Sequence, residues 1–274
     1  MLSAVTLRRL YVDEQLTMAE LAGRYACSAS TVRRRLREWT IPPRPRGPKT
    51  SHRGVHGAEG EIRWSAEVAW IVGLMASDGN LARAGHALSL ASNDVDLLET
   101  VRRILRIGNR LGRVQGGLGH ACYRLQWRDR GFHAWLTGIG LTPRKSLTLG
   151  PLAVPDQYFA DFFRGCIDGD GTILVYTDRY HAKRKATYVY QRLYVSIVSA
   201  SRPFVIWLQE TIARLTGARG AIYRKSGRDP RPIWTLRYAK RESLRLLPWM
   251  YSAPETPCLT RKRAKAEQFI PRPK

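Results

Sequence analysis

The sequence predicts an α+β protein in which a pseudo-symmetric tandem repeat of two αββαββα units follows a small all-α domain. The first observation is an internal repeat, because the apolar run WIVGLMASDGN at 70–80 matches FFRGCIDGDGT at 162–172. The second is that helical and alternating hydrophobic patterns recur in the same order after each run. The predicted segments are a domain at 1–41, a linker at 42–61, and two repeats at 62–155 and 156–274.

The composition indicates a polyanionic partner. The 274 residues contain 46 Lys and Arg against 22 Asp and Glu, a net charge of +24 with a pI of about 10.7. Such a chain repels itself unless a polyanion neutralises it, so nucleic acid is the expected partner and an anionic membrane surface the weaker alternative. No apolar run approaches the roughly 20 residues that span a bilayer, and no signal-peptide pattern begins the chain. We therefore expect a soluble, cytoplasmic protein of bacterial or phage type that does not bind membranes.

The first 41 residues predict three short helices. Residues 4–12 have apolar side chains at helical spacing, Thr17 and Glu20 form a capping box, and Ser28 is a suitable N-cap for the third helix. The stretch MAELAGRYACSASTVRRRL resembles a helix-turn-helix domain, whose last helix enters the major groove of DNA. The alternative is a three-helix cap with a solvated basic face. The candidate DNA contacts on the last helix are Ser30, Arg33, Arg34 and Arg37.

The linker at 42–61 is rich in Pro, Gly and basic residues and has no periodicity, which predicts an extended segment. Arg44 and Arg46 are candidate contacts to the phosphate backbone. His52 and His56 are four residues apart, but the surrounding prolines and glycines argue against a helix that would turn both towards one metal. We therefore expect them to be solvated.

The matching runs predict two helices packed closely together. Each contains a pair of small residues four apart, Gly73 with Ser77 and Gly165 with Gly169, so the helix backbones can approach each other. In each repeat the run is followed by two strands, a helix, two strands and a helix. These elements are expected at 79–92, 94–107, 110–115, 122–128 and 131–139 in the first repeat, and at 172–180, 187–199, 202–215, 220–225, 233–239 and 240–251 in the second.

Alternation along several strands predicts a sheet face rich in hydrogen-bonding side chains. In YRLQWRD, Leu125 and Trp127 project to one side and the polar residues to the other, and YVYQRLYVSIV alternates in the same way. A face of this kind suits a duplex groove, whereas for any single strand a solvated outer face is the plainer reading. The candidate DNA contacts are Arg113, Gln115, Arg124, Gln126, Arg128, Tyr190, Arg192, Tyr194, Arg224 and Arg237.

Each matching run ends in Asp-Gly. Asp78 and Asp170 stand at the negative end of a helix dipole, so something cationic should offset their charge. If the two helices pack side by side, the acids converge on a site suited to a hard divalent cation such as Mg²⁺. Gly79 and Gly171 are expected to let the chain leave each helix in a left-handed conformation.

These runs resemble the signature helices of the LAGLIDADG homing endonucleases in their single-chain, two-motif form, over residues 62–270. The resemblance implies two β-saddles that straddle DNA, with the motif helices between the halves. It also implies a divalent metal at the motif ends, Mg²⁺ or also Mn²⁺, with Asp78 and Asp170 as catalytic ligands. The metal site is expected to include Gly79 and Gly171, and the basic residues that support the transition state are expected to be Lys145 and Lys262.

Some motif positions depart from the family pattern. The first run has Ala76 where many members have an acid, and the second has Arg164 and Cys166 where small or aliphatic residues are usual. Asp168 is expected to be a helix-interface group and not the principal ligand.

The resemblance implies a site-specific, metal-dependent endonuclease that acts as a monomer on a long, asymmetric duplex and makes a staggered cut across the minor groove. One alternative is a catalytically inactive DNA-binding regulator of the same fold. Retention of Asp78 and Asp170 argues against it, because a pure binder gains nothing from carboxylates that face phosphates. The other is an intron maturase that binds RNA. A helix-turn-helix disfavours it, because the major groove of A-form RNA is too narrow for a recognition helix.

Overall fold

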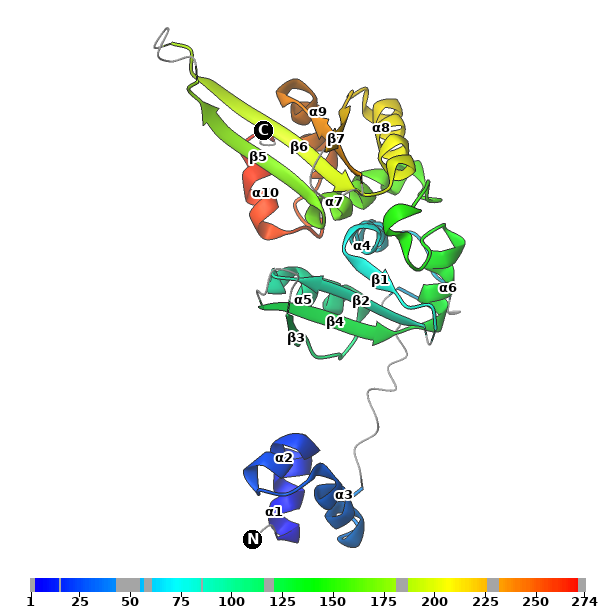
Figure 1. The fold of residues 1–274 in the computed structure, drawn as a ribbon, viewed down its shortest axis with the longest axis vertical. Helices are drawn as coiled ribbons and strands as arrows, with labels where there is room; N and C mark the ends of the chain where they lie inside the picture. The colour runs from blue at the N-terminus through cyan, green and yellow to red at the C-terminus, as the bar shows by residue number, and fades with distance from the viewer. Residues whose placement is uncertain are drawn as a thin grey trace. The chain divides into compact units, whose positions relative to one another are not determined.

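The computed structural model describes residues 3–14, 16–42, 55–56, 61–84, 86–115, 121–180, 187–225 and 232–270. The chain forms two compact units, Met1–Ser51 and His52–Lys274, so both repeats lie in one unit (Figure 1). Arg44, Arg46 and His52 lie outside the described residues, whereas the expectation of a solvated His56 is wrong: its side chain is 16% exposed and its Nε2 lies 2.8 Å from Asp129 Oδ2. None of the described helices is long and apolar enough to cross a membrane.

The N-terminal unit consists of short helices with capped ends. They are α1 (Ala4–Arg8), which continues into the π-helical turn η1 (Arg9–Asp13), α2 (Met18–Arg24) and α3 (Ala29–Glu38). The predicted capping box is present, with Glu20 N donating to Thr17 Oγ1 at 3.1 Å and Thr17 N donating to Glu20 Oε2 at 2.7 Å. Ser28 caps α3 as predicted. A small core holds the helices together and includes Leu7, Leu10, Tyr11, Leu21, Val32, Leu36 and Ile41.

The second unit confirms the predicted α+β fold class, with the αββαββα order in both halves. The first half contains α4 (Ala66–Ser77), β1 (Gly79–Leu81), β2 (Ala87–Ser92), α5 (Val95–Leu105), β3 (Gly112–Gln115), β4 (Ala121–Arg128) and α6 (Arg130–Gly138). The second contains α7 (Phe159–Asp168), β5 (Gly171–Asp178), β6 (Tyr190–Ser199), α8 (Arg202–Thr216), β7 (Ala221–Lys225), β8 (Ile233–Tyr238) and α9 (Lys240–Met250). The antiparallel sheets have equivalent strand orders, β1-β2-β4-β3 and β5-β6-β8-β7.

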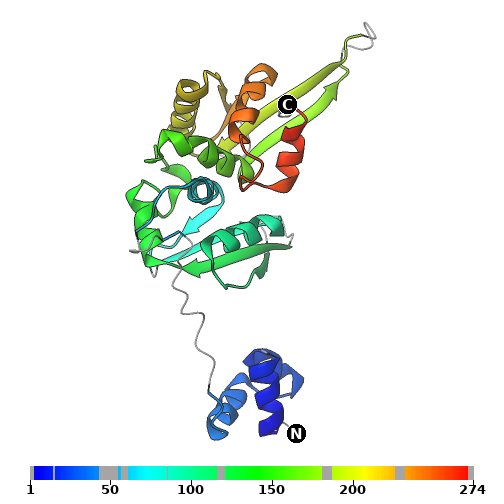
Figure 2. The same ribbon diagram turned by 180° about the vertical axis from the view of Figure 1, so that it is seen from behind.

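The two halves meet through α4 and α7, which lie side by side in both views (Figures 1 and 2). A Cβ on Gly73 would lie 2.1 Å from Phe162 O, and a Cβ on Gly165 would lie 2.1 Å from Trp70 O. Only glycine permits such a backbone contact. The second small residue of each run also lies at this contact, because a Cβ on Gly169 would lie 2.0 Å from Ser77 Oγ.

A buried polar contact crosses the helix interface on one side only. Trp70 Nε1 donates to Asp168 Oδ2 at 2.9 Å. The residues 92 positions away from each, Phe162 and Ala76, carry neither the donor nor the acceptor. The acceptor is absent at position 76 and the donor at position 162, so the motif helices make this contact once.

A final helix, α10 (Thr260–Glu267), was not predicted from the sequence. It packs against β5 and is the red helix of Figure 2. Arg164, only 1% exposed, anchors the preceding segment, since its guanidinium donates to the carbonyl oxygens of Met250 and Pro257. The buried Arg164 of the motif helix thus holds the C-terminal segment in place.

Candidate active site

Asp78 and Asp170 lie at the C-terminal ends of the two motif helices. Asp78 is the C-cap of α4, and Asp170 follows Gly169, the C-cap of α7. A Cβ on Gly169 would lie 2.9 Å from Asp78 Oδ2, and the two carboxyl groups are close enough for each to shift the pKa of the other. The structure therefore brings together the two acids that the repeat singled out.

The surroundings of the two carboxyl groups favour retention of a proton. Burial, and after it the neighbouring Asp170, raise the pKa of Asp78 to about 7, against the effect of the nearby lysines. Burial also raises the pKa of Asp170, while Lys145 lowers it. Both residues still expose surface to solvent, so the carboxyl groups are packed on one side and open on the other.

A buried lysine occupies the end of each motif helix. Lys145 Nζ donates to the carbonyl oxygens of Ser77 at 3.2 Å and Gly79 at 2.6 Å. Lys262 Nζ donates to four carbonyl oxygens of the second motif, those of Ile167, Asp168, Gly169 and Gly171, at 2.5–3.2 Å. These ammonium groups satisfy carbonyls that a helix end leaves unpaired and offset the negative end of its dipole. The cation expected beside each acid is thus partly supplied by the chain itself.

Burial lowers the pKa of both lysines, that of Lys262 to about 8, while the nearby aspartates act in the opposite direction. The structure shows which residue of the basic run at 261–263 contacts the motif. Arg261 pairs with Asp94 at 2.8 Å and Arg263 pairs with Glu267 at 2.8 Å, so only Lys262 among these three turns towards the motif.

The prediction of a left-handed conformation at Gly79 and Gly171 is wrong. Among the described glycines, only Gly140 and Gly217 have a positive φ in the range that side chains rarely adopt. Glycine is required for another reason: a Cβ at either motif position would lie 2.5 Å from a helix Cα, that of Met75 or Ile167. Each strand therefore starts pressed against the last turn of its motif helix.

The donor set fits a hard divalent cation better than Zn²⁺ or another metal that prefers nitrogen and sulfur ligands. Within the described residues, no group of three His, Cys, Asp or Glu side chains could hold a metal ion. Mg²⁺ needs fewer protein ligands, because it keeps several waters and is bound through one or two carboxylates together with substrate phosphates. Asp78 and Asp170 match this requirement. The carbonyl oxygens of Gly79 and Gly171 already accept from ammonium groups, so the carboxylates are the better candidates for ligands.

A polar recess of about 330 Å³ opens beside Asp78. The bidentate pair between Arg261 and Asp94 forms part of its wall and links α10 to the first half. Thr260 Oγ1 donates to Asp96 Oδ2 at 2.9 Å and adds a second link. The C-terminal segment thus spans both halves and places Lys262 at the motif.

We expect the response of the protein to Mg²⁺ to depend on pH. The folded-state pKa of Asp78, about 7, lies above the ordinary value of 3.8. Without metal, the protonated carboxyl therefore stabilises the fold below pH 4, and this contribution is lost as the pH rises through 7. Mg²⁺ can replace the proton, so the Tm measured with Mg²⁺ minus that with chelator should be larger at pH 8 than at pH 5. In Asp78→Asn this pH dependence should become smaller, and only the part that belongs to Asp170 should remain. Equal increments at both pH values in the wild type would contradict the expectation.

Each sheet has one face covered by helices and one open face. In the first sheet, Leu125 and Trp127 are buried on the helix side, while Arg124, Gln126 and Arg128 project to the open side. In the second sheet, the helix side buries Leu193, Val195 and Ile197. The residues predicted to contact DNA that lie on its open face are Tyr190, Arg192, Tyr194 and Arg237.

Three predicted DNA contacts lie on the other side of their sheets. Residues directly opposite each other in an antiparallel pair project to the same face. Arg113 pairs with Tyr123 and Gln115 with Ala121, which places both on the face of Leu125. Arg224 pairs with Trp234, on the face of the buried Leu236. The pairing register of these strands, and not their own sequence, decides the face of each side chain, and contact of these three residues with DNA stays a prediction.

The exposed face of α3 carries the side chains predicted there. Ser30, Arg33, Arg34 and Arg37 are all exposed. Arg34 forms a long pair with Glu38 at 3.5 Å, and Ser30 Oγ bonds to Ser28 Oγ at 2.7 Å.

Two αββαββα repeats that meet through their motif helices have the homing endonuclease fold. The structure of the meganuclease I-SmaMI bound to uncleavable DNA matches with a TM-score of 0.50 and 11% identity, over 73% of this chain and 87% of that one. The structure of I-DmoI in complex with DNA and Ca matches with a TM-score of 0.48 and 13% identity, over 74% of this chain and 97% of that one. The LAGLIDADG homing endonuclease I-LtrWI bound to target DNA matches with a TM-score of 0.47 and 13% identity, over 74% of this chain and 88% of that one. No protein-family model and no curated protein matches the chain.

Proposed function

We propose that this protein is a site-specific, divalent-metal-dependent endonuclease that cuts both strands of duplex DNA. The observation that carries the proposal is the meeting of Asp78 and Asp170 at the open ends of two packed helices, each backed by a buried lysine. The net charge of +24 and the open sheet faces support a duplex as the substrate. The meganuclease I-SmaMI, with a similar fold, was solved bound to DNA.

The two acids would hold Mg²⁺ or Mn²⁺, which supplies activated water and neutralises charge that develops on the phosphate. A cation held there would take the place of a proton on these carboxyl groups, whose pKa values are raised mainly by burial. Lys145 and Lys262 keep the motif ends rigid through their carbonyl bonds and contribute positive charge where the phosphates approach. One acid from each half gives one group for each strand, so a staggered cut across the minor groove by a monomer is the outcome we propose.

The halves are not identical, so we expect a long, asymmetric target. The N-terminal unit extends this target in our proposal, with α3 contacting DNA through Arg33, Arg34 and Arg37.

A selection for cleaved DNA tests the proposed function. The full-length protein is incubated with a randomised duplex library and Mg²⁺, beside a variant with Asp78→Asn and Asp170→Asn, and the cut ends are sequenced. Defined staggered ends that appear only with the wild type support the endonuclease. Enrichment of bound sequences without cutting would refute cleavage and indicate the regulator.

We expect the N-terminal unit to contribute affinity and not chemistry. Replacing Arg33, Arg34 and Arg37 by Ala in the full chain should weaken binding and reduce the slope of log K against log salt by about three, because each phosphate contact contributes roughly 0.9. Removing residues 1–51 should have at least this effect, with cutting retained at low salt. Titrations at several salt concentrations measure the slope. An unchanged slope would show that this unit contacts no phosphates.

A further inference from the structure

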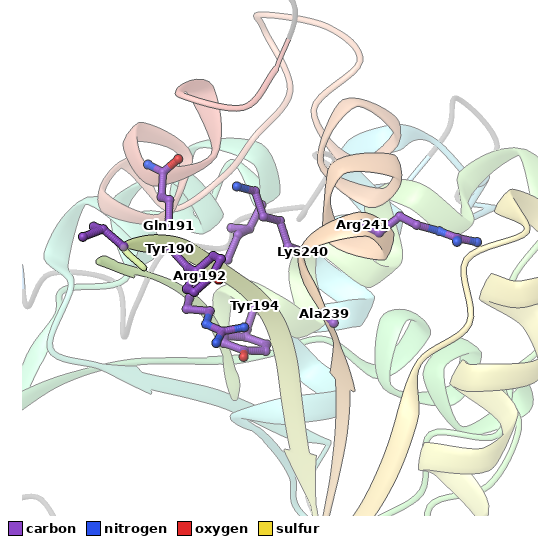
Figure 3. A pocket seen from close by; sticks show the side chains of 9 residues that line it. Tyr190, Gln191, Arg192, Tyr194, Ala239, Lys240 and Arg241 are labelled. Atoms are coloured by element: carbon purple, nitrogen blue, oxygen red, sulfur yellow. The ribbon is translucent and has the colours of Figure 1, made fainter. Parts of the chain in front are cut away.

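The open faces of the two sheets differ in how firmly they hold their arginines. The second sheet presents exposed tyrosines beside Arg192 and Arg237, among them Tyr190 at 47% and Tyr223 at 53% exposure. Figure 3 shows Arg192 and Tyr194 on one side of β6 and Gln191 on the other. The side chains of Tyr190, Gln191, Arg192 and Tyr194 line a hollow of about 450 Å³, which reaches Lys240 and Arg241 at the start of α9.

Arg192 is fixed from two directions. Its Nε donates to Asp178 Oδ2 at 2.9 Å, and its Nη2 lies 2.8 Å from the same oxygen. Its guanidinium carbon also lies 5.5 Å from the ring centroid of Tyr190, within the range of a cation–π contact. Since a guanidinium has five N–H donors in one plane, the outer edge formed by Nη1 and the second Nη2 hydrogen stays available for a ligand.

Arg237 is held by aromatic rings. Its guanidinium carbon lies 5.4 Å from the ring centroid of Tyr194 and 5.8 Å from that of Tyr223. Tyr194 is itself stacked on Tyr176, with ring centroids 6.4 Å apart. Contacts with π-faces attract the charge and leave the N–H donors for other partners.

The first sheet has no comparable arrangement. Among the described residues, no ion pair, hydrogen bond or ring contact holds the side chain of Arg124 or Arg128, and both are exposed. An unrestrained arginine loses rotamer freedom when it binds, whereas a fixed one has lost it already.

We propose that Arg192 and Arg237 determine the specificity of the second half by each reading a guanine, so that its half-site is read more stringently than that of the first half. This inference rests on the proposed function, because it requires duplex DNA on the open sheet faces. Guanine presents N7 and O6 side by side in the major groove, and the planar fork of Arg matches both acceptors. A mobile arginine reaches phosphates as well as bases and discriminates less.

The register fixes the expected spacing of the two guanines. Arg237 pairs with Ser196, four residues from Arg192 along β6. Four residues of an antiparallel strand span about 14 Å. With a rise of about 3.4 Å per base pair, the guanines lie about four base pairs apart when β6 follows the groove.

The test is a binding selection from a randomised duplex library, with full-length wild type, Arg192→Lys and Arg237→Lys. Lysine keeps the charge but lacks the fork, so each variant should relax one guanine preference about tenfold or more and leave the other positions unchanged. Asp178→Ala, which removes only the positioning carboxylate, should relax the same position as Arg192→Lys. Arg245→Ala is the matched control, because it removes an exposed charge from α9, on the helix-covered side of the same sheet. It should keep the whole preference pattern.

Guanine preferences that survive in both lysine variants, or affinity that falls equally for all sequences, would overturn the inference and leave the proposed function standing. The same holds if the first half-site proves the more stringent. A wild-type protein that enriches no sequence would overturn both. Thermal unfolding of every variant confirms that each is folded.

Discussion

Replacement of Asp170 by Asn should reduce DNA cleavage by about a thousandfold or more while binding stays equal or becomes tighter. The variant loses a charged oxygen that would hold the metal, and loss of one charge-stabilising group in an active site costs a hundred- to a thousandfold or more. Binding should not suffer, because a carboxylate that faces phosphates opposes association. Single-turnover cleavage of the selected site and a binding titration without metal measure the two effects.

The matched control is Asp156→Asn. Asp156 is an exposed carboxylate paired with Arg214 at 2.5 Å, and it is no part of the motif ends. Its replacement should leave both cleavage and binding unchanged. Full cleavage by Asp170→Asn, or weaker binding with cleavage retained, would remove Asp170 from the metal site.

Gly165→Ala should destabilise the second unit by about 3 kcal/mol or more. The new Cβ would lie 2.1 Å from Trp70 O and 3.0 Å from Gly73 Cα, so the contact is between backbones and no side chain can move aside. Overpacking of a tight core costs 1–3 kcal/mol even where side chains can adjust. Urea unfolding measures the loss, and the cleavage rate should fall with it because separation of α4 from α7 moves Asp78 away from Asp170.

Gly138→Ala provides the control for this change. Gly138 ends α6, its φ is not positive, and a Cβ there would meet nothing within 4 Å. Alanine is favoured over glycine in a helix by roughly 1 kcal/mol, so this variant should be as stable as the wild type or more so. If Gly165→Ala and Gly138→Ala unfolded at the same urea concentration, the close contact of the motif helices would be refuted.

The features that the sequence predicts well are those that depend on residues close together in the chain or on the internal repeat. The motif helices are predictable because Gly73 and Gly165 recur at matching positions of an internal repeat, and the capping box of α2 is predictable because its two residues lie three apart. The meeting of Asp78 with Asp170 follows from the same repeat, since equivalent ends of paired helices converge.

Other features depend on contacts between distant segments and leave no local signal. The burial of Lys262 depends on α10, which is positioned by Arg164 from a helix about a hundred residues earlier. The face on which Arg224 lies depends on the register between β7 and β8 and not on its own strand. The real requirement for Gly79, close packing against Met75, arises only once the strand has folded back on the helix.

The hydrogen bond from Trp70 to Asp168 across the motif helices has a consequence for how the two halves pair. A pair of two first halves would bury two indole N–H groups opposite alanine, and a pair of two second halves would bury two carboxylates opposite phenylalanine. Each indole N–H without a partner costs about 1–3 kcal/mol, and each carboxylate would keep only the bond that Leu259 N donates to it. The donor lies in the first half and the acceptor in the second, so each half pairs more favourably with the other half than with a copy of itself.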